Sequence, residues 1–145
     1  MDFKIGKKNI EVSFSSVTSK QLSKSQIEEY KEKYNEWKKL INMTTKELKD
    51  FMSTEEGKNA GLSRTETKNA GANGKKIRSG RDSARAIIRM KQKPFEKWNT
   101  DDIEWMLAQI SFVKRMSGNE GPLFKNDKMT RKMTSLLIWG HDPRK

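Results

Sequence analysis

The sequence predicts an all-α fold: a compact bundle of four to five short helices with an N-terminal β-hairpin arm. Two observations predict it. Apolar residues recur at steps of three and four along several stretches, which is the spacing of one helix face. Most of these stretches follow a Ser, Thr or Asn that can cap a helix. We divide the 145 residues into an arm at 1–22 and a helical domain at 23–145, with a flexible basic loop at about 57–78.

The arm is predicted from strict alternation of apolar and polar residues on both sides of Gly6–Asn9. The alternating apolar residues are Phe3, Ile5, Ile10, Val12 and Phe14. This pattern is typical of a β-hairpin. A lone hairpin is marginal in water, so we expect the arm to pack on the helical body, join another copy or protein partner, or remain a mobile tail.

The first helix is predicted to begin at Ser25, which forms a capping-box pattern with Glu28. Its apolar stripe is Ile27, Tyr30, Tyr34, Trp37 and Ile41. Thr44 and Glu47 repeat the capping box before a short helix. That helix presents Leu48, Phe51 and Met52, and Ser53 with Glu56 is expected to cap a further turn.

The next helix is predicted from Ser79, with Asp82 at its N3 position, to about Gln92, because Pro94 forbids continuation. A fourth helix follows a cap at Asn99 or Thr100 and ends at Gly118. Its expected buried face is Ile103, Met106, Leu107, Ile110 and Val113.

Residues 118–127 read as a loop, and Asp127 is expected to cap the last helix. The inward side chains of that helix are predicted to be Met129, Met133, Leu136 and Leu137. Gly140 stands where a C′ residue is expected, and Pro143 follows, as helix ends prefer.

The net charge of +12 is concentrated in one window. Residues 57–93 hold 11 basic and 2 acidic side chains, a net of +9, whereas residues 1–56 carry +1 and residues 94–145 carry +2. A soluble surface does not require such asymmetry, because mixed charges dissolve a protein equally well. A concentrated positive field attracts a polyanion.

Arg81, Arg85 and Arg89 share one helix face at i, i+4 and i+8. Next to it is an arc formed by Ala84, Ile87 and Ile88, of which Ile87 and Ile88 are expected to pack inward. The free amides and positive dipole end at a helix start attract phosphate. We expect Gly80, which has no side chain, to leave space for such a phosphate. The predicted nucleic-acid-binding residues are Lys75, Lys76, Arg78, Ser79, Gly80, Arg81, Arg85 and Arg89.

The sequence therefore predicts non-enzymatic binding of double-stranded nucleic acid, DNA before RNA, with low sequence specificity. A genome-organising role in a nucleoid or a virion-associated role fits such a protein. Three alternatives stay open. The arginine face could pair with acids of the first helix, such as Glu28 and Glu36. The protein could be a structural adaptor for an acidic partner, or an RNA- or ribosome-associated protein.

Catalysis and metal binding are not expected. The chain has no phosphate-binding P-loop, no cysteine and a single histidine, His141, which with Asp142 cannot complete a zinc site. Asp101, Asp102 and Glu104 fit the first turn of a helix better than a metal cluster. Trp98, Trp105 and Trp139 fit a core role better than base stacking. We expect no cofactor.

No apolar run suggests a signal peptide or a membrane span. We therefore expect a soluble protein that does not enter a membrane. Together with the lack of cysteines, this favours a location inside the cell, in the cytoplasm, nucleoid or nucleus, or in a virion assembled there.

Four sequence stretches, at 42–61, 79–91, 98–115 and 129–145, together resemble a small uncharacterised domain family of bacteria and viruses. The most specific pieces are the helix start Ser79-Gly80-Arg81 and the terminal Trp139-Gly140-His141-Asp142-Pro143. Members are often labelled DNA-binding proteins. The resemblance implies a compact helical domain that binds DNA without known catalysis, with Trp139 buried and His141 hydrogen-bonded. This chain departs from it in a longer basic loop at 64–78 and in its N-terminal 40 residues.

Overall fold

The structure, a computed structural model, describes residues 20–60 and 79–145. These residues form an all-α fold with one small hairpin, which confirms the predicted fold class. Its elements are α2 (Lys24–Leu40), α3 (Thr45–Met52), α4 (Glu55–Lys58), α6 (Gly80–Lys91), the 3₁₀ turn η2 (Phe95–Lys97), α7 (Thr100–Gly118), β1 (Phe124–Lys125), β2 (Lys128–Met129) and α8 (Arg131–Ile138).

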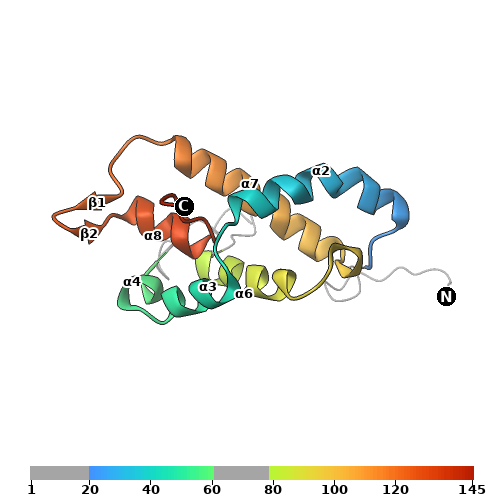
Figure 1. The fold of residues 1–145 in the computed structure, drawn as a ribbon, viewed down its shortest axis with the longest axis horizontal. Coiled ribbons are helices and arrows are strands. Elements are labelled where there is room, and N and C mark those ends of the chain that lie inside the picture. Colours follow the sequence, from blue (N-terminus) through green and yellow to red (C-terminus); the bar gives the residue numbers. More distant parts are fainter. Residues whose placement is uncertain (1–19, 61–78) are drawn as a thin grey trace, which may run out of the picture.

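The two longest helices, α2 and α7, pack against each other and form the upper part of the molecule in Figure 1. Helices α3 and α6 pack together below them, and α8 contacts α3, α4, α6 and α7. The β1–β2 hairpin lies beyond α8 at one end of the molecule (Figure 1).

Most of the predicted arm lies outside the described residues, but its last three residues have a clear place. The backbone at 20–22 runs beside residues 98–100. Leu22 N donates to Trp98 O over 3.2 Å, Thr100 N donates to Lys20 O over 2.8 Å, and Leu22 is buried. The helical body therefore includes residues that we had assigned to the arm.

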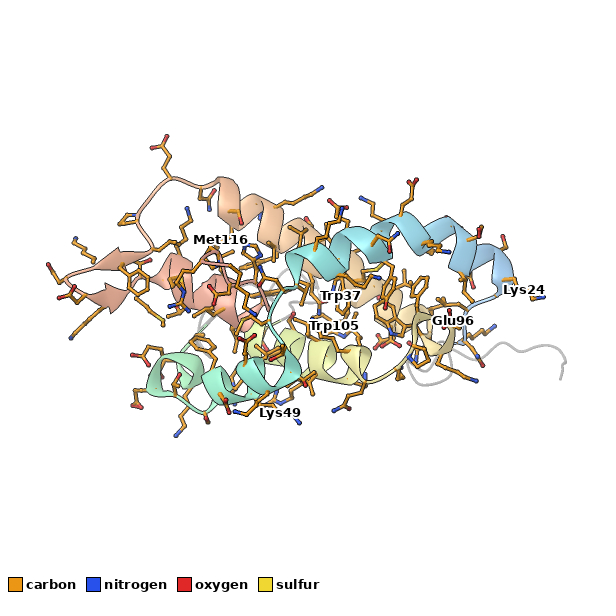
Figure 2. All side chains as sticks on the ribbon, in the orientation of Figure 1. Lys24, Trp37, Lys49, Glu96, Trp105 and Met116 are labelled. Atoms are coloured by element: carbon orange, nitrogen blue, oxygen red, sulfur yellow. The ribbon has the colours of Figure 1, made fainter. Side chains whose placement is uncertain are left out.

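Aromatic side chains fill the core between α2, η2 and α7. Trp37, which points inward in Figure 2, and Trp98 are 1% and 0% exposed, and their rings meet edge to face at 5.1 Å. Tyr34 stacks on Phe95 with ring centroids 4.3 Å apart. The predicted stripe of the first helix and the core role of Trp98 are confirmed.

A chain of buried hydrogen bonds crosses this core. Trp37 Nε1 donates to Gln109 Oε1 over 2.7 Å, and Gln109 Nε2 donates to Ser83 Oγ over 3.1 Å. All three residues are buried. Because a buried polar group without a partner is costly, this chain fixes α2, α7 and α6 relative to one another.

Three predicted helix starts are confirmed. Thr44 and Glu47 form the capping box of α3, the Ser79 side chain accepts from Asp82 N at the start of α6, and Asn99 caps α7. The prediction for α2 was wrong by two residues. Ser23, not Ser25, is its cap, because Gln26 completes a capping box with Ser23 in the way that Glu does elsewhere.

The expected cap of the further turn was wrong by one residue. Thr54 rather than Ser53 caps α4, and its hydroxyl accepts from Gly57 N over 3.0 Å. The Ser53 hydroxyl instead donates to the carbonyl of Asp50 over 2.8 Å, which closes the end of α3.

The segment predicted as a loop before the last helix contains the β1–β2 hairpin. Asn126 and Asp127 have φ of 53° and 65° and form its two-residue turn, which matches a type I′ turn. The expected cap at Asp127 is therefore wrong. Thr130 caps α8 through Met133 N, and Met129 is a half-buried strand residue rather than a helical one.

Two predicted core positions differ in the structure. Leu107 is 37% exposed, and Ile88 is only half-buried, whereas Ile87 is fully buried. The end of α8 is as predicted. Gly140 has φ of +86°, its N–H donates to Leu137 O, and His141 N donates to Leu136 O, which is a Schellman arrangement.

Candidate nucleic-acid interface

Gly80 starts α6 in a buried position against α8. A Cβ on this residue would lie 2.7 Å from Ile138 Cγ2 and 3.3 Å from Trp139 Nε1. The missing side chain thus allows two helices to approach closely, a role that sequence reasoning had not given it. The Ser79 hydroxyl is likewise occupied as the helix cap, accepting from Asp82 N over 3.0 Å.

Arg81 is half-buried and turned toward the protein. Its Nη1 donates to Gly57 O over 3.2 Å. This bond joins α6 to α4 across the segment 61–78, which the structure does not describe. Of the predicted arginine face, Arg81 is therefore the member most engaged in holding the fold.

Arg85 is the most exposed described member of the predicted site. Its side chain is 58% exposed, and its Nη1 lies 3.0 Å from Asp82 Oδ1, one turn earlier on the same helix. Exposed pairs of this kind contribute about 0–1 kcal/mol. A phosphate could therefore replace Asp82 as the partner of Arg85 at little cost.

Arg89 faces the start of α7. Its Nη2 lies 3.6 Å from Asp102 Oδ1 and 3.8 Å from Asp101 Oδ2. Asp102 is 1% exposed, and its Oδ2 accepts from Lys93 Nζ over 2.7 Å and from Asn99 N over 3.1 Å. The first-turn role that we predicted for Asp102 is confirmed, and Lys93 is a partner that sequence reasoning left out.

The acids that meet α6 are thus not those of the first helix. Glu36 on α2 pairs instead with Lys114 and Lys33. The hydrogen bond from Lys114 is the main reason that the pKa of Glu36 is lowered. Within residues 20–60 and 79–145, no acid of α2 forms an ion pair with an α6 arginine.

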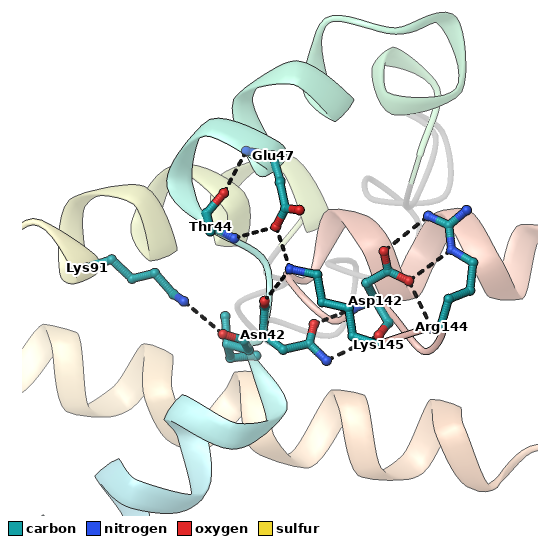
Figure 3. A network of polar contacts seen from close by, with 8 residues as sticks. Asn42, Thr44, Glu47, Lys91, Asp142, Arg144 and Lys145 are labelled. Atoms are coloured by element: carbon teal, nitrogen blue, oxygen red, sulfur yellow. Dashed lines mark hydrogen bonds and ion pairs between the residues drawn. The ribbon is translucent and has the colours of Figure 1, made fainter.

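Lys91, near the end of the basic window, and His141 have structural partners at the end of α2, and Figure 3 shows the contact of Lys91. Lys91 Nζ donates to Ile41 O over 2.8 Å, and burial lowers the pKa of this lysine. His141 Nδ1 lies 2.6 Å from Leu40 O. Two of the carbonyls that a helix end leaves without partners are therefore satisfied from distant parts of the chain. The expected hydrogen bond of His141 is confirmed.

The C-terminal residues complete the same junction. Asn42 and Asp142 exchange two hydrogen bonds, of 3.1 and 2.8 Å. Lys145 Nζ donates to Glu47 Oε1 over 2.7 Å, as Figure 3 shows. Hydrogen bonds from the Arg144 side chain are the main reason that the pKa of Asp142 is lowered. These groups stabilise a corner of the fold.

The remaining predicted contacts, Lys75, Lys76 and Arg78, lie outside the described residues. Residues 61–78 hold 5 basic and 1 acidic side chains, a net of +4. Of the predicted residues that the structure describes, Arg85 and Arg89 remain exposed. Gly80 is buried, and Ser79 and Arg81 are engaged in hydrogen bonds within the protein. Among the described residues, no three His, Cys, Asp or Glu side chains gather as a metal site would require.

Comparison with protein families identifies a match over most of the chain. Residues 36–137 match the family described as "Protein of unknown function (DUF3140)". The chain belongs to this family. The DUF3140 match is consistent with the resemblance to an uncharacterised family, but it does not extend to the terminal Trp139–Pro143, and its description assigns no DNA binding.

Neither the curated proteins nor the solved structures contain a match to this DUF3140 chain. None of the helices in the two described ranges is both long enough and apolar enough to cross a bilayer.

Proposed function

We propose that this DUF3140 protein binds double-stranded nucleic acid without catalysis and with low sequence specificity. Its preferred ligand is DNA rather than RNA. The observation that carries the proposal is the net charge of +9 within residues 57–93. A regular polymer of phosphates matches a dense cluster of cations, and the resulting affinity does not depend on base sequence.

The geometry of α6 supports this function through Arg85 and Arg89, which are 58% and 49% exposed. Their guanidinium groups can bind phosphate oxygens with two parallel hydrogen bonds. Lys75, Lys76 and Arg78 directly precede the helix and add three cations. A genome-organising or virion-associated role would use such sequence-tolerant binding.

The test is a salt titration of binding to duplex DNA, duplex RNA and an acidic protein. With Arg81 held by Gly57 O, five cations remain as phosphate contacts, and they give a log–log slope of about −4.5 on B-DNA. Duplex binding with a slope near zero would overturn the proposal. Tight binding to the acidic protein alone would establish the adaptor alternative instead.

Arg85→Ala sharpens the test, with Lys46→Ala as the matched control. Each change removes one cation and one exposed intrahelical ion pair, with Asp82 and Asp50 respectively. If Arg85 contacts a phosphate, its loss makes the negative slope shallower by about 0.9, whereas the loss of Lys46 leaves the slope unchanged. Equal effects of the two variants would remove Arg85 from the interface.

A further inference from the structure

The β1–β2 hairpin presents a second group of cations, away from α6. Residues 124–128 are all exposed, and Phe124 is 41% exposed. Figure 1 shows the hairpin at one end of the molecule, beyond α8. Little of its surface is used in the packing of the core, so the reason for its sequence must be sought outside the core.

Lys125 and Lys128 stand directly opposite each other across the hairpin. Like charges at opposite positions of an antiparallel pair destabilise it. No acid among the described residues lies within ion-pair distance of either lysine, although Asp127 stands in the turn between them. An anion that contacts both ammonium groups would offset this repulsion, so the two lysines together form a favourable anion-binding site.

The hairpin is held firmly at its base. Thr130 N donates to Leu123 O over 2.9 Å, and Thr130 Oγ1 donates to Pro122 O over 2.7 Å. Lys132 Nζ donates to Asn119 O over 2.5 Å. The two lysines therefore project from an anchored turn, which reduces the conformational entropy that binding must overcome.

Helix α8 connects this hairpin to the start of α6. Its first residue follows the hairpin, and Ile138 at its last turn contacts Gly80. Eight helical residues span about 12 Å, so the hairpin and the start of α6 lie closer together than one turn of a duplex, which is about 34 Å.

We propose that the Lys125–Lys128 pair is a second phosphate-binding element, which contacts the backbone of the same duplex as α6. This inference rests on the proposed function. It adds a contact that the sequence analysis missed, because it read the segment as a loop and found no charge excess there.

The double variant Lys125→Ala/Lys128→Ala tests the inference by salt titration on duplex DNA. The loss of two phosphate contacts should make the negative slope shallower by about 1.8. The matched control is Lys24→Ala/Lys31→Ala on α2, which removes the same charge from exposed positions. Figure 2 shows Lys24 at the opposite end of the molecule from the hairpin. The control should leave the slope unchanged.

Lys128→Glu separates binding from hairpin stability. It changes the net charge by the same amount as the double alanine variant, but it places a cross-strand ion pair opposite Lys125. We expect a melting temperature at or above that of the wild type and the same fall in slope. A variant that folds well and binds poorly cannot be explained by a damaged hairpin.

The outcomes separate the two proposals. If the wild type binds the duplex with a steep slope and both hairpin variants match it, the inference is overturned and the proposed function stands. The inference is also overturned if the α2 control loses as much slope as the hairpin variants, because net charge alone would then explain the effect. If the wild type shows no salt-dependent duplex binding, both proposals fall.

Discussion

Replacing Gly80 by Ala tests the close approach of α6 and α8. The added Cβ would lie 2.7 Å from Ile138 Cγ2, about 1 Å inside the optimal carbon–carbon separation. Ile138 is fully buried and has little room to move. Overpacking of this kind costs about 1–3 kcal/mol, whereas exchanging Gly for Ala in a helix contributes about 0.5–1 kcal/mol in the other direction. We expect a net loss of about 1 kcal/mol.

Denaturant melts of Gly80→Ala measure this loss, and a thermal melt should show a fall of roughly 4 °C. Gly118→Ala is the matched control, because it lies at the end of α7 with no atom within 4 Å of an added Cβ. That variant should be as stable as the wild type or slightly more stable. If Gly80→Ala gains stability like the control, the packing explanation is wrong. If the same variant also binds the duplex more weakly, the role of Gly80 is to leave space for a phosphate.

Other predictions concern the core and the C-terminal junction. Gln109→Leu leaves the buried indole N–H of Trp37 without its acceptor, so denaturant melts should show a loss of about 1–3 kcal/mol; unchanged stability would contradict this. Ile87→Ala, at a fully buried position, should cost about 2–5 kcal/mol in the same assay, and a loss below that range would mean that the core closes around the gap. Arg144 lowers the pKa of Asp142 in the folded state. The stability that this carboxylate contributes is therefore fully present above its ordinary pKa of 3.8, and it is lost as the pH falls through the lowered pKa of the folded state. The stability difference between the wild type and Asp142→Asn should therefore shrink in melts below about pH 4, and a constant difference would show that the pair with Arg144 does not contribute.

Helix starts were predictable where a capping side chain had no close competitor. Ser79 has no other capping side chain within two positions, and it caps the helix that we expected. Asn99 has Thr100 beside it, and the sequence left the choice between these two residues open. At Ser23 and Ser25, two serines compete, and the choice depends on Gln26 reaching back to the backbone of Ser23. Local sequence does not distinguish such neighbours, because either residue can supply the hydroxyl.

The partners of the basic residues could not be predicted, because they come from other elements. Asp102 was correctly placed in a first helix turn, but its approach to Arg89 depends on how α7 crosses α6. The hairpin was missed for a different reason. Its strands are two residues long, too short to show alternation, and the Asn126–Asp127 turn was the only local signal.

The junction at the end of α2 joins residues that are synthesised far apart in time. Leu40 meets His141 across 101 positions, and Asn42 meets Asp142 across 100. At about 5–20 residues per second, a ribosome needs roughly 5–20 s to make the intervening chain. During that interval the carbonyl of Leu40 lacks its partner His141, so the helix made first is expected to complete its C-terminal end last.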